Sequence, residues 1–486
     1  MCRRARATLV FAFLLLAGGC GDRGELQFDP ATFTAGTPEV SAIREAAWGA
    51  NVVICVIDAA RADHIGCYGY PRATTPNMDR LAEESFVFRH HFCQYPSTKP
   101  STASLFTSQY SDTHLALEGR RFLEGTFTLA QGFERAGFRT VLFSSNPNAS
   151  PAMGIGLDFQ KVYDQRDVEP LVSNWEKFTL PQPLLTLIEA WLDKNGDSRF
   201  LAYVHFDPPH QPYLQPEEMT RLFAGKRPPG FERGAFEFPV GDEKLLSTCN
   251  HPPLPEWINL YDANLRFADW AVGEVERLLR SAGVFDNTVF VVSADHGEAF
   301  GEHGYLWHER GVYDELVHIP LLMRLPGGKL AGDVEGLTES IDLLPTLCDM
   351  LEVPYPREGI QGKSLLRAMA GLEEEVRGHV FCRSDGRPPS YLMRGKEWAL
   401  VLYGNGEWRA LYDLAADPGQ RQNVIAENPD AADAMLAGFR EFALQQRRPP
   451  VDFLSPEVEM PPLPEAGETA LTPEMQRQLR ALGYVK

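Results

Sequence analysis

Two short segments of the chain carry residue types that can bind a metal ion. Asp58 directly follows the apolar run Asn51–Ile57, and Asp295-His296 follow the apolar run Thr288–Ser293. The working residues of an α/β sheet gather at the carboxyl ends of its strands, so we expect these side chains to meet. Aspartate oxygens with an imidazole suit zinc or manganese, and suit calcium less naturally. Taken alone, Asp58 would equally suit a turn or a helix cap.

A threonine two positions before a proline offers a nucleophile. Thr98 stands in the run Ser97-Thr98-Lys99-Pro100, and the Ser/Thr-rich sequence after it is typical of a helix start. Free backbone N–H groups at a helix N-terminus favour an incoming or developing anion. Most Ser/Thr-Pro clusters are ordinary caps and turns, so a chemical role for Thr98 depends on the other motifs.

Two histidines lie in loops whose composition makes them rigid or tightly turned. His210 lies in the segment 205–213, which contains three prolines, and His308 ends the glycine-punctuated segment 301–308. Histidines so placed can protonate a leaving group or hold an anionic oxygen, although each could equally be a structural loop residue. Five other histidines have no comparable context and are expected to be structural: His64, His90, His91, His114 and His318.

The elements that would position these residues follow a repeating pattern. Continuous apolar runs predict buried strands, and helical patterns lie between them. The predicted strands are Asn51–Ile57, Thr140–Phe143, Phe200–His205, Thr288–Ser293 and Ile319–Met323, and the predicted helices are Pro76–Glu84, Leu184–Leu192 and Glu256–Arg280. This alternation predicts an α/β sheet covered by helices on both faces.

The pattern changes after about Arg367. Short alternating aromatic segments, Tyr391–Arg394, Trp398–Tyr403 and Trp408–Tyr412, predict a small antiparallel sheet, and a helix is expected over Asp430–Gln446. We therefore expect a catalytic domain over 49–366, a C-terminal α+β subdomain over 367–447, and a proline-rich acidic tail with a terminal helix over 448–486.

The N-terminal 19 residues have the features of a signal peptide. Three arginines precede the apolar stretch Leu9–Leu16, which is short for a membrane span. Leu16-Ala17-Gly18-Gly19-Cys20 resembles a bacterial lipobox, which implies lipidation of Cys20 and a tether over residues 20–48. A plain secretory signal is the alternative. In either case we expect an exported protein, periplasmic or in the cell envelope, and the lipobox further implies a membrane anchor.

The net charge limits the partners. It is −20 for the whole chain, and removal of residues 1–19 takes away three arginines and no acidic residue, which lowers it to −23. A nucleic-acid partner needs a basic face and is excluded, whereas an anionic substrate is compatible if a metal ion reverses the local field. The six cysteines other than Cys2 and Cys20 lack metal-finger spacing and are expected to be buried thiols; one unassigned disulfide would be compatible with export.

Together these motifs resemble the sulfatase family of the alkaline phosphatase superfamily. The resemblance is carried by Asp58–Asp79 and Ser293–Gly304, which look like the family's two metal-binding segments, and by Thr98–Tyr110, which resembles its nucleophile segment. Ser340–Leu347 and Tyr412–Leu414 match later landmarks. The implied fold is a large mixed sheet sandwiched by helices, with a small C-terminal antiparallel-sheet subdomain.

Two departures from the family pattern bear on the chemistry. Sulfatases carry a cysteine or serine, oxidised to formylglycine, in the motif C/S-x-P-x-R; here Thr98 replaces the cysteine and Thr102 the arginine. Family members usually have two adjacent aspartates in the first metal segment, whereas Ala59 follows Asp58 here. We therefore expect one divalent metal ion, zinc or manganese in preference to calcium or magnesium, with a second metal left open. The implied ligands are Asp58, Thr98, Asp295 and His296.

A threonine nucleophile with this metal set is similar to nucleotide pyrophosphatases, lipoteichoic-acid synthases and phosphoethanolamine transferases. The resemblance implies phosphoester hydrolysis or phosphotransfer through a phosphothreonine formed on Thr98. It also implies that His210 contacts or protonates the leaving oxygen and that His308 holds a non-bridging oxygen or assists the second step. Lys99 and Asn146 are expected to contact the substrate, a small-molecule or glycan or lipid ester.

Two alternatives remain open. The first is a sulfuric ester hydrolase that uses unmodified Thr98 without formylglycine. The second, of another class, is an inactive envelope protein that binds glycans or lipids through the same pocket.

Overall fold

The computed structural model describes most of the chain between residues 30 and 447. The described residues are 30–117, 125–171, 180–211, 213, 215–223, 255–304, 306–308, 310–386, 389–404 and 408–447. The predicted leader, the lipidation site Cys20 and the tail 448–486 lie outside them, so these expectations stay predictions. Among the described residues, no helix combines the length and the apolar character that crossing a membrane requires.

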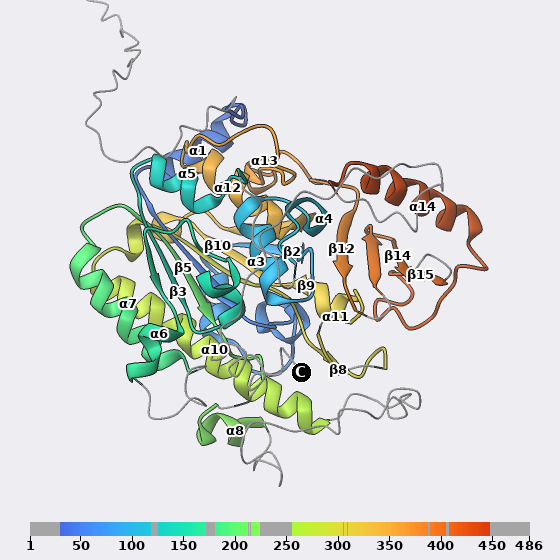
Figure 1. The fold of residues 1–486 in the computed structure, drawn as a ribbon, viewed down its shortest axis with the longest axis horizontal. Helices are drawn as coiled ribbons and strands as arrows, with labels where there is room; N and C mark the ends of the chain where they lie inside the picture. Colours follow the sequence, from blue (N-terminus) through green and yellow to red (C-terminus); the bar gives the residue numbers. More distant parts are fainter. Residues whose placement is uncertain are drawn as a thin grey trace, which may run out of the picture.

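A mixed sheet of nine strands forms the centre of the molecule (Figure 1). Its order is β11-β2-β10-β6-β1-β5-β3-β4, and β9 also pairs with β2. β1 runs parallel to β5 and β6, whereas β10 is antiparallel to β6 and β2. The strands are β1 (Asn51–Ile57), β2 (Phe86–Phe92), β3 (Arg139–Ser144), β4 (Lys161–Tyr163), β5 (Phe200–Phe206), β6 (Thr288–Ala294), β9 (His318–Ile319), β10 (Leu321–Arg324) and β11 (Gly332–Glu339).

Alternate residues of β1 show how the sheet is sandwiched. Val53, Cys55 and Ile57 belong to a core shared with α7 and α10, whereas Val52, Ile54 and Val56 belong to a core shared with α3, α5 and α12. Successive strand side chains point to opposite faces, so a continuous apolar run requires cover on both sides. The covering helices are α2 (Pro76–Ala82), α3 (Thr98–Thr107), α5 (Leu129–Arg135), α7 (Pro181–Asn195), α10 (Pro255–Ser281) and α12 (Leu343–Met350).

The predicted strand Ile319–Met323 is wrong in detail, because it is divided into β9 and β10 around Pro320. Proline has no N–H to donate to a ladder, so a strand is interrupted there. β2 and β11 were not predicted. β2 contains the polar run Arg89-His90-His91, and β11 starts with exposed residues, so neither shows a continuous apolar run.

Residues 30–48 differ from the expected tether. They include α1 (Pro38–Ala47), which Thr37 caps by accepting a hydrogen bond from Val40 N. Val40, Ile43 and Ala47 are buried, at a spacing that places them on one helical face. An ion pair between Arg44 and Asp349 also fixes this segment to the catalytic domain.

The C-terminal subdomain lies beside one end of the molecule (Figure 1). Its antiparallel sheet has the order β12-β13-β14-β15 and packs against α14 through a separate core that includes Leu400, Leu402 and Phe439. The elements are β12 (Val380–Ser384), β13 (Ser390–Arg394), β14 (Trp398–Tyr403), β15 (Trp408–Asp413) and α14 (Pro429–Leu444). The three predicted strands and the helix are confirmed, and β12 is an additional strand.

Candidate active site

The carboxyl ends of three adjacent strands converge at one point. Asp58 follows β1 and Asp295 follows β6, while His205 lies near the end of β5, in register with Val56. β1 is the middle strand of the three, and Asp58 N donates to Phe206 O at 2.9 Å, which extends the ladder past the strand end. The topology therefore places all three side chains on the same edge of the sheet.

These three side chains form a cluster that suits a cation. One ligand atom from each of Asp58, His205 and Asp295 lies within 4.8 Å of the others, and all three residues are buried. His205 Nε2 is 3.2 Å from Asp58 Oδ2 and 3.8 Å from Asp295 Oδ2. Among the described residues, Asp58 Oδ1 and Asp295 Oδ2 have no hydrogen-bond donor. Buried carboxylate oxygens without donors are costly, so the residues present fit a divalent metal ion.

The Asp295-His296 pair reaches the cluster because the chain turns immediately after β6. Asp295 Oδ1 accepts hydrogen bonds from Ala59 N and from His296 N. His296 Nδ1 donates to Gly297 O, so Nε2 faces the carboxylates, 3.5 Å from Asp58 Oδ1. Gly297 is required here because a Cβ at this position would lie 2.1 Å from the backbone oxygen of Glu315.

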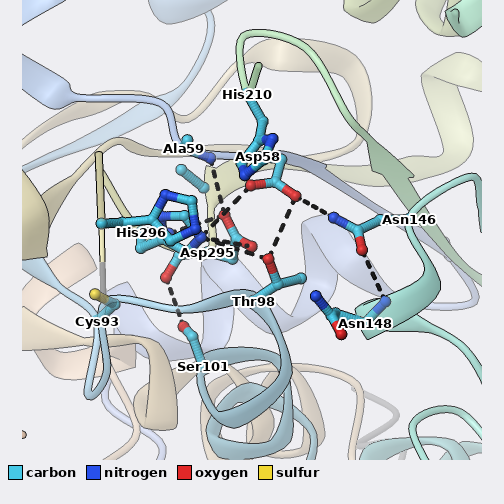
Figure 2. A network of polar contacts seen from close by, with 12 residues as sticks. Asp58, Ala59, Cys93, Thr98, Ser101, Asn146, Asn148, His210, Asp295 and His296 are labelled. Carbon is cyan, nitrogen blue, oxygen red and sulfur yellow. Dashed lines mark hydrogen bonds and ion pairs between the residues drawn. The ribbon is translucent and has the colours of Figure 1, made fainter. Parts of the chain in front are cut away.

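Thr98 opens α3 with its hydroxyl in the centre of the network (Figure 2). Its Oγ1 is 3.4 Å from Asp58 Oδ2 and 3.4 Å from His296 Nε2, and the residue is fully buried. Ser101, one turn further along the helix, donates to Asp295 O at 2.5 Å and so fixes α3 to the end of β6. At the start of α3, the Thr98 hydroxyl therefore faces the cluster of Asp58, His205 and Asp295, and the Ser101 hydroxyl attaches the helix to the end of β6.

The two residues expected to contact substrate have different surroundings. Asn146 Nδ2 donates to Asp58 Oδ2, and its Oδ1 accepts from Asn148 N, so in this structure it orients Asp58. Lys99 is only 2% exposed and adjoins Thr98 in the chain. Contact between Lys99 and a substrate therefore stays a prediction.

His210 and His308 are both brought to the site. Their ring centroids are 4.9 Å apart, and that of His308 is 4.4 Å from that of His296. His210 points into the network, and its Nδ1 donates to Gln211 O (Figure 2). His308 Nδ1 lies 3.3 Å from Glu298 Oε1. All six residues predicted for catalysis or metal binding are therefore close together, and Asn146 lies beside them.

Burial dominates the protonation equilibria of the acidic residues. It raises the pKa of Asp58 well above its usual range, and the neighbouring charge of Asp295 adds to the effect. It also opposes ionisation of Asp295, but His296 and His205 outweigh it and lower the pKa of that carboxyl. A bound dication would reverse this balance, because positive charge favours both ionised carboxylates.

The histidines respond to burial in the opposite direction. Burial and then the neighbouring His308 lower the pKa of His210 to about 3. Burial and then His296 lower the pKa of His308 well below its usual value. Both rings are therefore neutral near pH 7 in the substrate-free site, and each can accept a proton when a charged substrate enters.

From the sequence, His205 and Glu298 have no predicted functional role, and Asp207 is considered only as a ligand of a second metal ion. His205 ends the predicted strand Phe200–His205, and this position matches those of Asp58 and Asp295. Asp207 is buried, and its Oδ2 has no donor among the described residues. Glu298 is buried beside His308, and burial raises its pKa to about 7. The strand-end position was the available signal for His205.

Comparison with known proteins gives two matches to family profiles. A family described as Sulfatase matches residues 50–353, and one described as N-sulphoglucosamine sulphohydrolase, C-terminal, matches residues 301–440. An ulvan-active sulfatase of Formosa agariphila is 24% identical over 414 residues, which cover 78% of this chain and 77% of the relative. A choline-sulfatase of Rhizobium meliloti is 25% identical over 76% of this chain and 81% of its own length.

Solved structures show the same fold. The phosphonate monoester hydrolase of Agrobacterium radiobacter superposes with a TM-score of 0.68 at 22% identity, over 82% of this chain and 96% of that one. The phosphonate monoester hydrolase of Silicibacter pomeroyi gives a TM-score of 0.63 at 22% identity, over 83% and 96% of the two chains. The mixed sheet between helices and the small C-terminal sheet predicted from the sequence are thereby confirmed.

Proposed function

Because this chain belongs to the sulfatase family and is therefore an ester hydrolase, we propose that it is a metal-dependent enzyme that cleaves phosphoric esters with Thr98 as nucleophile. The observation that carries the proposal is the position of Thr98 Oγ1, 3.4 Å from Asp58 Oδ2 and buried beside carboxylate oxygens that lack donors. A formylglycine precursor is missing from this position, so the nucleophile proposed is the unmodified hydroxyl.

The metal ion would be held by Asp58, His205, Asp295 and His296, with the Thr98 hydroxyl facing it. If Nδ1 of His205 donates to the Tyr203 hydroxyl, 3.0 Å away, its Nε2 offers a lone pair to the cation. A divalent cation in this position supplies the positive charge that makes a threonine hydroxyl a competent nucleophile at neutral pH. The imidazole ligands favour zinc or manganese.

In the proposed first step, Thr98 Oγ1 forms a bond to phosphorus and the bond from phosphorus to the leaving oxygen breaks. The hydroxyl proton passes to Asp58 Oδ2, its hydrogen-bond acceptor. The charge of the bound phosphoryl group raises the proton affinity of His210, whose Nε2 then delivers a proton to the leaving oxygen. Lys99 and His308 stabilise the non-bridging oxygens.

In the second step, water attacks phosphorus and the bond from phosphorus to Thr98 Oγ1 breaks, which releases phosphate. The proton held on Asp58 Oδ2 returns to Thr98 Oγ1 and restores the hydroxyl. His210, now neutral, takes the proton of the attacking water. An acceptor alcohol in place of water would give phosphotransfer instead of hydrolysis.

A second candidate is hydrolysis of sulfuric esters by the same hydroxyl. It is favoured by the curated relatives, which are named as sulfatases and align with about three quarters of this chain. Sulfur would be attacked in line as phosphorus is, and the same residues would serve.

The test compares three nitrophenyl esters, a phosphate monoester, a phosphate diester and a sulfate, with wild type and Thr98→Ala. We expect phosphoester turnover that falls by at least about 10³-fold in Thr98→Ala, because the covalent step is lost. Thr107→Ala is the matched control, since Thr107 lies on the same helix and donates only to Ala103 O. Acid quenching should trap phosphate on the peptide that contains Thr98.

Three outcomes decide between the candidates. Faster turnover of the sulfate ester selects the sulfatase candidate. Full activity of Thr98→Ala rejects Thr98 as nucleophile in either reaction. No turnover of any ester, combined with no bound metal, favours the inactive binding protein.

We also propose that the protein is an exported lipoprotein anchored through Cys20. The proposal is supported by the lipobox-like run that ends at Cys20. Cells expressing the full chain should incorporate labelled palmitate into it, and Cys20→Ala should abolish the label. Persistent labelling of Cys20→Ala would contradict this assignment.

A further inference from the structure

Two cysteines from distant parts of the sequence meet where the C-terminal sheet adjoins the active site. Cys93 directly follows β2 and lies beside the network of the active site (Figure 2). Cys382 lies in β12, and both residues are buried. Cys93 is close enough to contribute to the raised pKa of the Cys382 thiol, and all five described cysteines are present as thiols.

The backbone around the pair is held on both sides. Arg383 N donates to Gln94 O at 3.1 Å, so β12 is joined to the segment that follows Cys93. Asp385 N donates to the Tyr95 hydroxyl at 2.9 Å, and Cys93 N donates to Val317 O at 3.0 Å. The hydrogen bond between the residues that follow Cys93 and Cys382 holds the two cysteine backbones close together, which is the arrangement that a disulfide requires.

We propose that Cys93 and Cys382 form a disulfide that links the segment just before Thr98 to the C-terminal sheet. The inference is independent of the proposed substrate. A thiolate of the pair attacks a small-molecule disulfide such as oxidised glutathione, and the other thiolate then displaces the bound glutathione. One Cys93–Cys382 bond forms, the glutathione disulfide bond breaks, and two molecules of reduced glutathione leave with the two thiol protons.

The bond would hold the segment that carries Thr98. Only four residues separate Cys93 from Thr98, and the neighbours Gln94 and Tyr95 already bind the C-terminal subdomain. Burial, followed by the contact with Cys93, raises the pKa of Cys382 well above its usual value. A buried thiol of this kind exchanges slowly, so we expect the bond to form while the sheet docks during folding, and to resist reduction afterwards.

Peptide mapping tests the bond directly. The full chain is refolded with reduced and oxidised glutathione, its free thiols are alkylated in denaturant, and the unreduced protein is digested for mass spectrometry. We expect a peptide containing Cys93 joined to one containing Cys382, lighter than the two thiol peptides by two hydrogen atoms. Recovery of both cysteines alkylated, or of either joined to Cys249, would overturn the proposal.

Thermal unfolding provides a second measurement. Cys93→Ala and Cys382→Ala should each lower the Tm of the oxidised protein by about 5 °C or more, and the double variant should fall no further, because one bond is lost in all three. When a phosphine reductant is present, the differences in Tm between these variants and the wild type should shrink. Cys348→Ala removes a buried thiol elsewhere and should behave the same with and without reductant. The bond would be contradicted if the decreases in Tm of the two single variants add up in the double variant and are the same with and without reductant.

Discussion

At the scale of single residues, the most informative feature of the site is a pair of buried carboxylate oxygens that accept no hydrogen bond from the described residues. Asp58 Oδ1 and Asp295 Oδ2 are buried without a donor among the described residues, although His205 Nε2 and His296 Nε2 lie close by. Protein donors rarely leave two such oxygens unsatisfied. The arrangement is therefore expected to be more stable with a cation than without one.

Metal removal should consequently destabilise the protein. At a thousandfold excess of metal over its Kd, binding adds about 4 kcal/mol to the free energy of unfolding. Chelation should therefore lower the Tm, and added zinc should restore it. His205→Ala should weaken zinc binding by at least about 10-fold, measured by competition with a chromophoric chelator. His90→Ala, which changes a histidine outside the cluster, is the control; equal affinity in both variants would remove His205 from the ligand set.

Glu298 should act by positioning His308. Its Oε1 lies 3.3 Å from His308 Nδ1, which fixes the imidazole so that Nε2 is the remaining ring nitrogen. Glu298→Gln should lower kcat by about 10- to 100-fold with little change in KM, because the ring is misplaced while substrate still binds. Glu274→Gln is the control, because Glu274 lies on α10 and pairs with Arg277 instead of a histidine. A change confined to KM would contradict the positioning role.

Much of the site could be predicted from the sequence, because several of its residues directly follow predicted strands whose carboxyl ends meet at one edge of the sheet. Asp58 and Asp295 come directly after apolar runs, and the parallel pairing of β1 with β6 brings them together. Asn146 was expected at the substrate but binds Asp58. Its position at the end of β3 indicates proximity to the site, whereas its hydrogen-bond partner depends on side-chain geometry that a linear pattern does not contain.

At the scale of elements, continuous apolar runs predicted the central strands and failed at the sheet edge. β1, β3, β5 and β6 are covered on both faces, and each contains a continuous run of buried, mostly apolar residues. β2 is buried too, but its middle residues Arg89 and His90 are partly exposed and interrupt the run. An element whose burial comes from neighbours distant in sequence has no strong local signal.

Buried histidines of these elements should make the stability pH-dependent. Burial lowers the pKa of both His91 and His114 to about 3. The unfolded chain binds protons near pH 6.5 whereas the folded protein does not, so each residue's contribution is complete above pH 6.5 and declines as the pH falls toward 3. At pH 5 the loss is about 2 kcal/mol for each histidine.

His114→Asn isolates one of these contributions. His114 Nδ1 accepts from Ala116 N, and an asparagine oxygen can replace that acceptor. The variant should be less stable than wild type at pH 7, and the difference should narrow by about 2 kcal/mol at pH 5. Urea unfolding at both pH values measures it. A constant difference would show that His114 does not titrate differently in the two states.

At the scale of the whole molecule, the C-terminal subdomain completes the catalytic domain instead of merely following it. Phe381 N in β12 donates to Glu339 at the end of β11, and Gln94, four residues before Thr98, donates to the same carboxylate. The signal-like segment at the N-terminus predicted export, and the negative net charge argued against a nucleic-acid partner. The short alternating aromatic segments after Arg367 predicted the subdomain. The exact domain boundaries and the roles of both termini remain predictions. The contact between the catalytic domain and the C-terminal subdomain could not be predicted, because it depends on how the two pack together and the sequence of neither indicates this.

One buried cation holds that contact together. Arg377 forms ion pairs with Glu339 and Asp342, and all three side chains are buried. Replacing it with methionine would leave two buried carboxylates without their counter-ion, which costs about 3–5 kcal/mol. Arg377→Met should therefore lower the free energy of urea unfolding by this amount at pH 7, whereas Arg367→Met, at an exposed position, should change it by less than about 0.5 kcal/mol.

The pH dependence of Arg377→Met separates loss of the ion pairs from loss of packing. Without the guanidinium, burial and mutual repulsion raise the pKa of both carboxyls further above their unfolded values. A group whose folded pKa is raised is most stable in its protonated form, so the deficit of the variant should shrink as the pH falls from 7 to 5. A deficit that is the same at both pH values would mean that the methionine packs badly and that the two carboxylates find other partners.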